Sequence, residues 1–267
     1  GGGVGIGDFN NDGLPDIFTT DMLPYEDKRI KTTTSFESYD MYHLKEKSGF
    51  YHQFTQNTLQ LNSGVGKLYE TAHFSGVAAS DWSWGGLVFD ADNDGWNDIF
   101  VCNGIYHDVT NLDFINFFAN DMIQKMVLTG KKEEIESIIN KMPSVPISNK
   151  VFRNNGDLTF KDAGNEWGLN QPSFSNGSAY GDLDNDGDLD LVTNNVNGPA
   201  FIYRNNAGAQ KNNHYIAVTL KQSGKNTFAV GSSIRVFSGE KLYQPEAFNL
   251  LLIIKILLGW ATANPIR

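Results

Sequence analysis

The sequence predicts an all-β fold, namely a partial β-propeller of about three four-stranded blades, with a helical insertion and a small C-terminal β module. Three observations lead to this prediction. One acidic phrase occurs three times, glycine and apolar positions flank each copy at the same distances, and short apolar runs with Asn-rich turns follow each copy. Repeated units of this kind bury their apolar faces against their neighbours, as propeller blades do.

The acidic phrase has the pattern Asp-x-(Asp or Asn)-x-Asp-Gly-x-x-Asp and occupies residues 8–16, 90–98 and 182–190. Each copy has a glycine five residues before its first Asp and an apolar pair nine and ten residues after it. These residues are Gly3, Ile17 and Phe18, then Gly85, Ile99 and Phe100, then Gly177, Leu191 and Val192. Each acidic loop therefore joins two short apolar runs, which we expect to pair as strands.

A third and a fourth strand complete the predicted blade. The third ends in an Asn-rich turn in all three units (TLQLNSG, VFRNNG and FIYRNN), and a fourth run follows in the first two (KLYET and LTFKD). Asn-Gly between apolar runs is a strong short-range signal for a β-hairpin. The units also share one register, because Gly64 and Gly76 lie twelve residues apart, as do Gly156 and Gly168.

Two inserts lengthen the first two units. The acidic loops begin 82 and 92 residues apart (8 to 90 and 90 to 182), whereas a compact blade takes roughly 40 to 50 residues. We expect the polar and aromatic residues 21–54 to form an ordered surface loop. We expect residues 108–148 to be helical, with an ordinary apolar helix core, because apolar residues recur at helical spacing before Gly130 and before Pro143. These are Phe114, Ile115, Phe118, Met122 and Met126, then Ile135, Ile138, Ile139 and Met142.

Both inserts leave from the same edge of their blades, which places them to build one cap over one propeller face. The blades are predicted to span residues 1–206. Residues 214–220 and 232–237 alternate as half-buried strands, so a separate β module is expected at 212–244.

The tail at 245–267 departs from these patterns. Its apolar run, residues 248–260, is interrupted by Lys255 and is shorter than the roughly 20 residues that cross a bilayer. We interpret it as a buried segment or as an artefact of truncation or of a reading-frame error. The chain also lacks an initial Met and a signal segment, so we expect that processing or fragmentation removed the original N-terminus.

Composition excludes several function classes. The chain has 31 Asp plus Glu against 21 Lys plus Arg, a formal charge of −10, so a nucleic-acid-binding surface is not expected. Its single cysteine, Cys102, cannot form an internal disulfide, and no Cys/His cluster is present for zinc. Three bound divalent cations would add roughly +6, which indicates that much of the acidity belongs to ligands.

The acidic phrase predicts about three Ca²⁺ sites, because oxygen ligands at alternate positions with a glycine at the sixth let a short loop surround a hard cation. The predicted ligands are Asp8, Asn10, Asp12, Asp16 and the Leu14 carbonyl; Asp90, Asp92, Asp94, Asp98 and the Trp96 carbonyl; and Asp182, Asp184, Asp186, Asp190 and the Asp188 carbonyl. An EF-hand would need Glu at the twelfth position, where this chain has Thr19, Val101 and Thr193. The alternative is that these residues form simple Asx turns; three copies in one register favour metal.

The sequence patterns that would indicate catalysis are weaker than the pattern that predicts metal binding. The five histidines (His43, His52, His73, His107 and His214) are far apart and lack metal-ligand spacing. Ser83 and Ser175 resemble nucleophile turns, but no GxSxG is present, so tight packing is the better interpretation. The glycine-rich start, GGGVGIG, has no βαβ unit around it that would make it a phosphate loop. Trp82, Trp84 and Trp96 form either an aromatic ligand platform or, as we favour, blade core.

The segments GDFNNDGLPDIF, FDADNDGWNDIF and GDLDNDGDLDLV, with VFRNNGDLTFKDAG, resemble FG-GAP or VCBS repeat proteins, whose best-known relative is the calcium-binding propeller of integrin α subunits. The resemblance covers about residues 1–206, and residues 212–244 look like the start of an ASPIC/UnbV module. DMLPYED, SGFYHQ and SDWSW are similar to segments of large cell-surface proteins of Bacteroidetes. These likenesses imply a seven-bladed propeller with Ca²⁺ in its loops; this chain holds only about three blades, too few to close a ring.

The resemblance also implies an exported protein, with a signal peptide in the parent, at the cell surface or outer membrane. We therefore predict a non-catalytic binding, cell-adhesion or scaffold module for an unknown protein or glycan ligand, with no transmembrane segment. One alternative is a polysaccharide-active or other hydrolase beneath the inserts, which His43, His52 and His107 meeting acidic residues in one cleft would favour. Another is a structural spacer.

Overall fold

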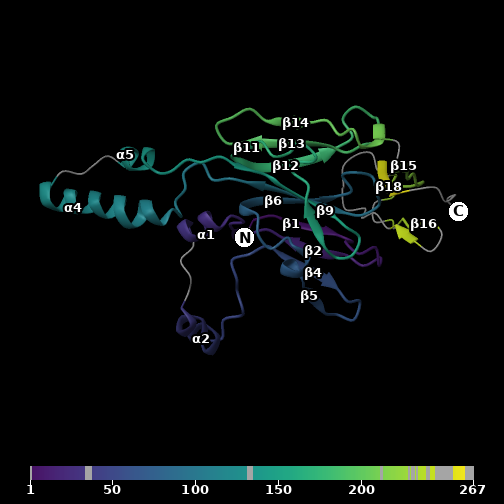
Figure 1. The fold of residues 1–267 in the computed structure, drawn as a ribbon. Helices are drawn as coiled ribbons and strands as arrows, with labels where there is room; N and C mark the ends of the chain where they lie inside the picture. The colour runs from purple at the N-terminus through teal and green to yellow at the C-terminus, as the bar shows by residue number, and fades with distance from the viewer. Residues whose placement is uncertain are drawn as a thin grey trace.

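A computed structural model describes residues 2–33, 38–130, 135–210, 213–227, 229, 232, 234–238, 241–243 and 255–261. The described part is mostly β. Three antiparallel sheets follow one another along the chain and form a curled, propeller-like body (Figure 1). Helices project from this body, and small strand pairs accompany the sheets.

The first two sheets have the predicted strand order. The first is β1 (Val4–Gly7), β2 (Asp16–Thr19), β4 (Thr58–Asn62) and β5 (Leu68–Glu70), each antiparallel to the next. The second is β6 (Asp81–Phe89), β7 (Asp98–Asn103), β9 (Lys150–Asn154) and β10 (Phe160–Asp162), with β3 (Met22–Leu23) added beside β6. The acidic phrases connect the first two strands of each sheet, as the sequence predicts.

The third sheet is shorter. It contains β12 (Ser175–Gly181), β13 (Asp190–Asn195) and β14 (Phe201–Tyr203). A 3₁₀ helix, η2 (Ala207–Gln210), follows β14. The minor elements are the strand pair β8 (Ile147–Ser148) with β11 (Pro172–Ser173), and the one-turn helix α3 (Ala72–Ser75).

The sheets stack through two buried clusters that share strand β7. Successive side chains of a strand point to opposite faces. Accordingly, Ile99 and Val101 join Phe18 of the first sheet in one cluster, whereas Phe100 and Cys102 join the other. The second cluster includes Leu191 of the third sheet. Every residue of β7 is therefore buried, and the second sheet is enclosed by its two neighbours.

Glycines permit the close approach of the first strands. Strand β6 contacts both β1 and β12. A Cβ on Gly5 would lie 2.5 Å from Cγ2 of Val88, and one on Gly7 would lie 2.5 Å from its Cγ1. A Cβ on Gly3 would lie 2.7 Å from the backbone nitrogen of Gly86. Gly3, Gly5 and Gly7 thus lie so close to the second sheet that residues without a side chain are required there.

The first insert contains two helices, where the sequence analysis expected a loop. They are α1 (Asp27–Thr33) and α2 (Tyr39–Lys47), and no residue of either is buried. Ser38 caps α2, since its hydroxyl accepts a hydrogen bond from the Met41 amide. The helices escaped prediction because they have no buried apolar stripe, which is the main sequence signal for a helix.

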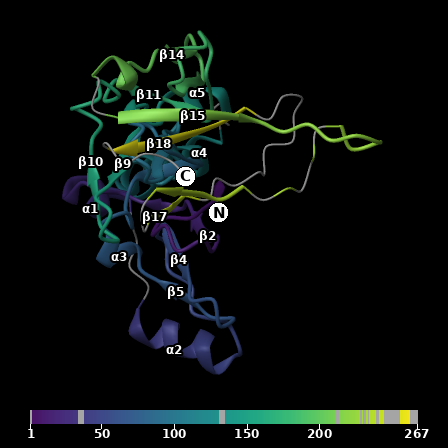
Figure 2. The same ribbon diagram turned by 90° about the vertical axis from the view of Figure 1, so that its right-hand side faces the viewer.

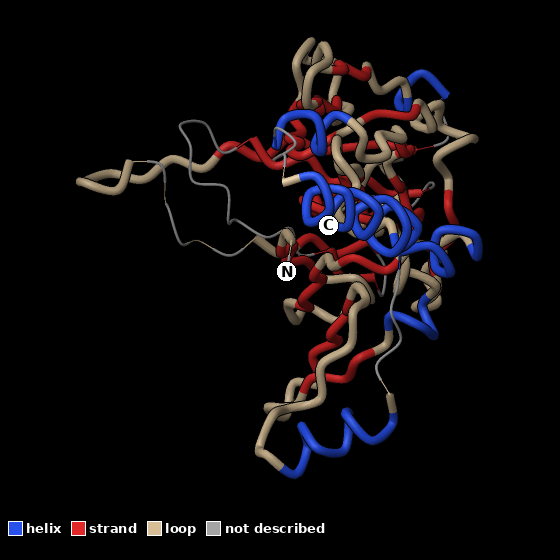
Figure 3. Tube along the Cα trace, turned by 90° about the vertical axis from the view of Figure 1, so that its left-hand side faces the viewer, coloured by secondary structure: helices blue, strands red, loops and turns tan. Residues whose placement is uncertain are grey.

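The second insert is helical as predicted. It contains the π-helical turn η1 (Phe114–Ala119), α4 (Asn120–Thr129) and α5 (Ile135–Asn140). Gly130 ends α4 in the left-handed conformation, with φ of 63°. Helices α2 and α4 project from the body in different directions (Figures 1 and 3), so they do not form one cap.

The inserts do meet at their bases. Arg29 of α1 makes two hydrogen bonds to Asp81, of 2.7 and 2.9 Å, and one of 3.0 Å to Asp108. Both aspartates are buried. This ion-pair cluster fixes the start of the second insert to the first.

Beyond the third sheet, β15 (Asn213–Thr219) pairs with β18 (Lys255–Ala261), and β16 (Val236–Ser238) pairs with β17 (Lys241–Tyr243) (Figure 2). Most of the apolar run predicted at 248–260 lies outside the described residues; its last part falls within β18. No helix in the described ranges combines the length and apolar character needed to cross a membrane.

Candidate metal centres

The three acidic loops share one backbone conformation. The asparagine at the fourth position has positive φ in each loop, with values of 55°, 59° and 63° for Asn11, Asn93 and Asn185. The glycine at the sixth position has φ of 83°, 89° and 95° in the same order. Asn and Gly adopt this conformation at lowest cost. The asparagine stands at the fourth position in all three copies, and it is a signal for this turn that the predicted pattern did not include.

In the first two loops, the first aspartate holds the turn. Asp8 accepts hydrogen bonds from the amides of Asp12 and Gly13, at 3.2 and 2.7 Å. Asp90 accepts the equivalent bonds from Asp94 and Gly95, at 3.0 and 2.9 Å. These bonds direct the first carboxylate towards the inside of the turn.

The ninth-position aspartate ties each loop to its own sheet. It accepts one amide N–H from the second residue of the loop and one from the asparagine at the end of the third strand. The two distances are 2.9 and 2.8 Å for Asp16, 3.0 and 2.8 Å for Asp98, and 2.9 and 2.8 Å for Asp190. All three aspartates are buried. Asn62 and Asn154, which end β4 and β9, and Asn205, which follows β14 by two residues, are therefore site residues that were not among the predicted ligands.

Carboxylates converge in the second and third loops. Oxygens of Asp90, Asp92 and Asp98 lie within 4.8 Å of one another, and so do those of three aspartates in the third loop. The latter are Asp182, Asp184 and Asp186. Among the described residues, the first loop has no triplet this close, consistent with Asn10 replacing a carboxylate.

Some predicted ligands lie outside these triplets. For Asp188 the predicted ligand is the carbonyl, and its side chain accepts hydrogen bonds from Asn93 Nδ2 and from the Gly208 amide, both at 2.7 Å. Asp94 bonds the Trp96 amide, and Asp12 bonds the Leu14 amide. Leu14 and Trp96 thus have their amides turned to the fifth-position carboxylate.

Burial and mutual repulsion make these carboxylates hard to ionise. Burial, followed by the charge of nearby carboxylates, raises the pKa of Asp90 and of Asp98 well above its ordinary value. Burial raises the pKa of Asp16 to about 6, and burial together with Asp92 raises the pKa of Asp94 to about 6. A divalent cation would remove this penalty, and an all-oxygen donor set in one turn fits a hard cation.

Arginines partly neutralise the second and third loops. Arg153 Nε lies 2.8 Å from Asp92 Oδ2, and its Nη2 lies 3.4 Å from Asp94. Arg204 repeats these two distances with Asp184 and Asp186. The first loop has Leu61 at the equivalent position, but it also has one carboxylate fewer. The formal charge of the predicted ligand side chains plus the arginine is therefore −3 in both the first and the second loop.

Hydrogen bonds join each loop to the next. Asn154 Nδ2 donates to the Phe9 carbonyl at 2.9 Å, and Asn205 Nδ2 donates to the Ala91 carbonyl at 2.7 Å. In the opposite direction, Asn11 Nδ2 donates to the Gly95 carbonyl at 3.0 Å. The candidate centres thus lie along one connected edge of the sheets.

One known protein-family model matches a segment of the chain that includes part of this edge. Residues 144–193, which run from β8 to the first part of β13 and include the third acidic loop, match a family model described as an FG-GAP-like repeat. None of the curated proteins compared with the chain matches it.

The serines considered as nucleophiles lie at the other edge of the sheets, and Ser175 falls within the FG-GAP-like repeat. Ser83 is buried and donates to Asn103 Oδ1 at 2.9 Å; Ser175 is buried and donates to Asn195 Oδ1 at 2.7 Å. Asn149 Nδ2 also donates to Ser175, at 2.9 Å. No histidine takes part in these bonds, which supports packing and polar cross-linking as their role.

The histidines do not meet in one cleft. His43 and His52 both approach Glu46 on the first insert, whereas His107 packs against Tyr106. His73 bonds Gln56 at 2.9 Å, and the side chain of His214 lies outside the description. The hydrolase alternative therefore lacks the convergence that would favour it.

The tryptophans do not share one platform. The rings of Trp82 and Trp84 are 6.2 Å apart, and Trp84 Nε1 bonds the Gly104 carbonyl. Trp96 lies in the second acidic loop against Gly156, in the FG-GAP-like repeat. The three tryptophans therefore form neither a single ligand platform nor a single buried core.

Proposed function

We propose that this chain is a non-catalytic binding or scaffold module made of propeller blades and stabilised by about three Ca²⁺ ions. The observation that carries the proposal is the convergence of carboxylate oxygens in loops that also hydrogen-bond to neighbouring sheets. Neutralising such a loop strengthens the turn and, through the asparagine bonds, the contact between sheets. The FG-GAP-like repeat supports the same interpretation.

The proposed ligands are the predicted ones. Asp90, Asp92 and Asp98, and likewise Asp182, Asp184 and Asp186, have the closest geometry. The remaining side chains, Asp8, Asn10, Asp12, Asp16, Asp94 and Asp190, and the carbonyls of Leu14, Trp96 and Asp188 complete the sets. Calcium is favoured over magnesium because it accepts many oxygen ligands with flexible geometry.

The cellular role follows from the resemblance to FG-GAP/VCBS proteins. We propose an exported protein at the cell surface, associated with the outer membrane, that binds a protein or glycan in adhesion. A structural spacer in a longer protein would have the same calcium sites but no ligand. Binding of any defined ligand by the purified chain separates the two roles.

Calcium dependence can be measured on the purified chain. Sites with dissociation constants of about 0.1 to 1 mM would each contribute roughly 0.4 to 1.4 kcal/mol in millimolar calcium. Chelation should then lower the melting temperature by several degrees, at about 2 to 4 °C per kcal/mol. Calorimetric titration should count about three ions, and terbium in the second loop should be sensitised by Trp96. A chain that takes up no calcium and melts unchanged in EDTA would contradict the proposal.

Matched variants locate the ions. Asp92→Asn should abolish terbium emission sensitised by Trp96, because Asp92 belongs to the closest triplet of that loop. Asp121→Asn is the control, since Asp121 lies on α4 and pairs with Lys125. Equal emission from the two variants would remove the second loop from the proposal.

A further inference from the structure

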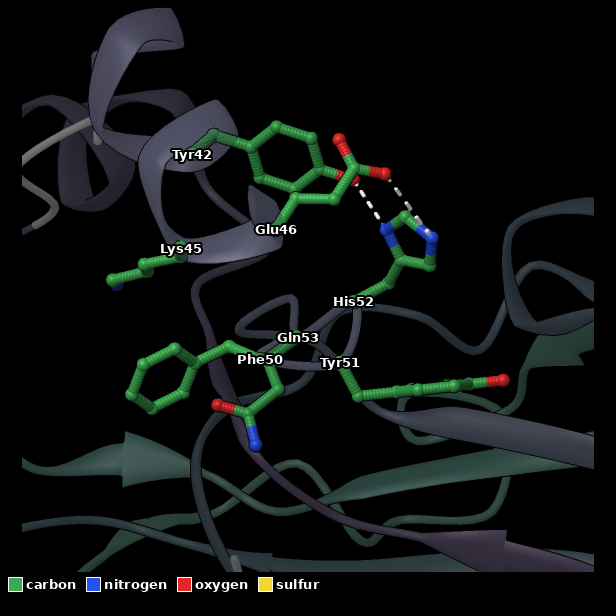
Figure 4. A pocket seen from close by; sticks show the side chains of 7 residues that line it. All are labelled: Tyr42, Lys45, Glu46, Phe50, Tyr51, His52 and Gln53. Carbon is green, nitrogen blue, oxygen red and sulfur yellow. Dashed lines mark hydrogen bonds and ion pairs between the residues drawn. The ribbon is translucent and has the colours of Figure 1, made fainter. Parts of the chain in front are cut away.

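The first insert carries a pocket that belongs neither to the sheets nor to the acidic loops. It is lined by residues of α2 and of the segment after it, and its cavity measures about 130 Å³ (Figure 4). The lining residues are Tyr42, Lys45, Glu46, Phe50, Tyr51, His52 and Gln53. We call it the α2 pocket.

Aromatic rings on and around the α2 pocket are exposed to solvent. Tyr51 is 87% exposed, and Phe50 and Phe54 are also exposed. The Tyr42 ring stacks at 6.1 Å on Phe54 and at 6.0 Å on His52. Clustered exposed rings cost solvation free energy and are typical of binding surfaces.

Polar groups in the α2 pocket are held in position by one another. The Tyr42 hydroxyl lies 2.5 Å from His52 Nδ1, and His52 Nε2 lies 3.8 Å from Glu46 Oε1. The other Glu46 oxygen is 3.2 Å from His43 Nδ1. Figure 4 shows Tyr42, Glu46 and His52 directed towards one another. The carboxylate and imidazole are therefore oriented before any ligand arrives.

The lining offers both donors and acceptors beside apolar ring faces. Lys45 donates, Glu46 accepts, and the Gln53 amide does both. A pyranose ring has the complementary chemistry, with C–H groups on its faces and hydroxyl groups around its rim. Charges of both signs in the pocket give no preference for an ionic ligand. A metal site is not indicated, because His43, Glu46 and His52 are not among the convergent metal-ligand groups of the described residues.

The cavity size limits the ligand. Pockets that enclose a drug-sized molecule measure roughly 300 to 1,000 Å³, so the α2 pocket suits one ring rather than a whole oligomer. We infer that the α2 pocket binds one pyranose unit of a neutral glycan, with the ring stacked on Tyr51 and its hydroxyls bonded by Glu46, His52 and Gln53. This inference rests on the proposed binding function and names its ligand class.

The test uses the full chain in calcium with defined neutral hexasaccharides of glucose, mannose, xylose and N-acetylglucosamine. Saturation-transfer NMR should show transfer to at least one of them, and calorimetry should give a dissociation constant near millimolar, as expected of a small site. Tyr51→Ala should weaken binding about tenfold, the scale of one lost stacking contact. Glu46→Gln should weaken it by a similar factor, since the amide loses one acceptor and the orientation of His52.

The control variant is Tyr39→Ala, because Tyr39 is 75% exposed on the same helix but does not line the pocket. It should bind as the unaltered chain does, and all three variants should keep the parent melting temperature. No saturation transfer to any hexasaccharide, or equal binding by the Tyr51→Ala and Tyr39→Ala variants, would overturn the inference. If the unaltered chain binds no hexasaccharide but is still stabilised by calcium, the proposed calcium-stabilised module stands and only the glycan assignment is wrong.

Discussion

The second and third acidic loops have nearly the same sequence but different surroundings. Equivalent predicted ligands differ in exposure, with 18% for the Asp92 side chain and 37% for the Asp184 side chain. Their arginine partners differ likewise, with 39% for Arg153 and 66% for Arg204. The second loop is bonded to the first loop through Asn97 and Asn154 and to the third through Asn93. The neighbouring sheets, not the phrase itself, therefore set the electrostatics of each loop.

The largest effect should come from the buried ninth position of the second loop. Asp98→Ala leaves the amides of Ala91 and Asn154 without their acceptor, at roughly 1 to 3 kcal/mol for each unsatisfied group. We expect a loss of about 3 kcal/mol in denaturant unfolding of the calcium-free chain. Asp98→Asn keeps one oxygen and should lose about half as much. Asp184→Ala, in the exposed loop, should change stability by less than about 0.5 kcal/mol. Equal losses of unfolding free energy from Asp98→Ala and Asp184→Ala would contradict the expectation that the buried aspartate contributes more than the exposed one.

A pH titration should give the next largest effect. The pKa values of Asp16 and Asp94 are raised from 3.8 to about 6, so between these values the folded chain binds more protons than the unfolded chain. Raising the pH through this window therefore lowers the free energy of unfolding of the calcium-free chain, by roughly 2 kcal/mol for each of the two groups. Calcium should reverse the slope, because it binds the ionised carboxylates. Calcium-free unfolding curves that stay constant from pH 4 to pH 6 would contradict the raised pKa values.

The arginine pairs should give the smallest effect and sharpen the comparison. Without calcium, Arg153→Ala should destabilise the chain by about 1 kcal/mol, and Arg204→Ala by no more than about 0.5, because exposed ion pairs contribute little. Millimolar calcium should reduce the Arg153 effect, since the ion then neutralises the same carboxylates. Urea unfolding with and without calcium measures both variants. A larger loss of stability from Arg204→Ala than from Arg153→Ala would contradict the expectation that the more buried ion pair contributes more.

The strands and loops could be predicted because their signals are local and repeated. Apolar runs around the acidic phrase, with Asn-rich turns at fixed distances, indicated the hairpins, and β2, β7 and β13 begin at the ninth-position aspartates. The α4 and α5 helices had apolar periodicity. Helices α1 and α2 lacked it, and their residues are not buried.

Contacts between units could not be predicted from one unit. Asn154 ends a strand in its own sheet, and only the stacked structure shows its amide reaching the Phe9 carbonyl of another. The same holds for Asn93, whose partner is Asp188, and for Arg29, which joins the two inserts. Such pairs are far apart in the chain, and no local periodicity marks them.

The asparagine cross-bonds also explain where the chain tolerates added sequence. At the edge with the acidic loops, each turn must match the turn before and after it, so extra residues there would displace several bonds at once. The β2–β4 and β7–β9 connections, at the other edge, carry the inserts. The insertions therefore lengthen these units at one edge only and leave the turns of the opposite edge in register with one another.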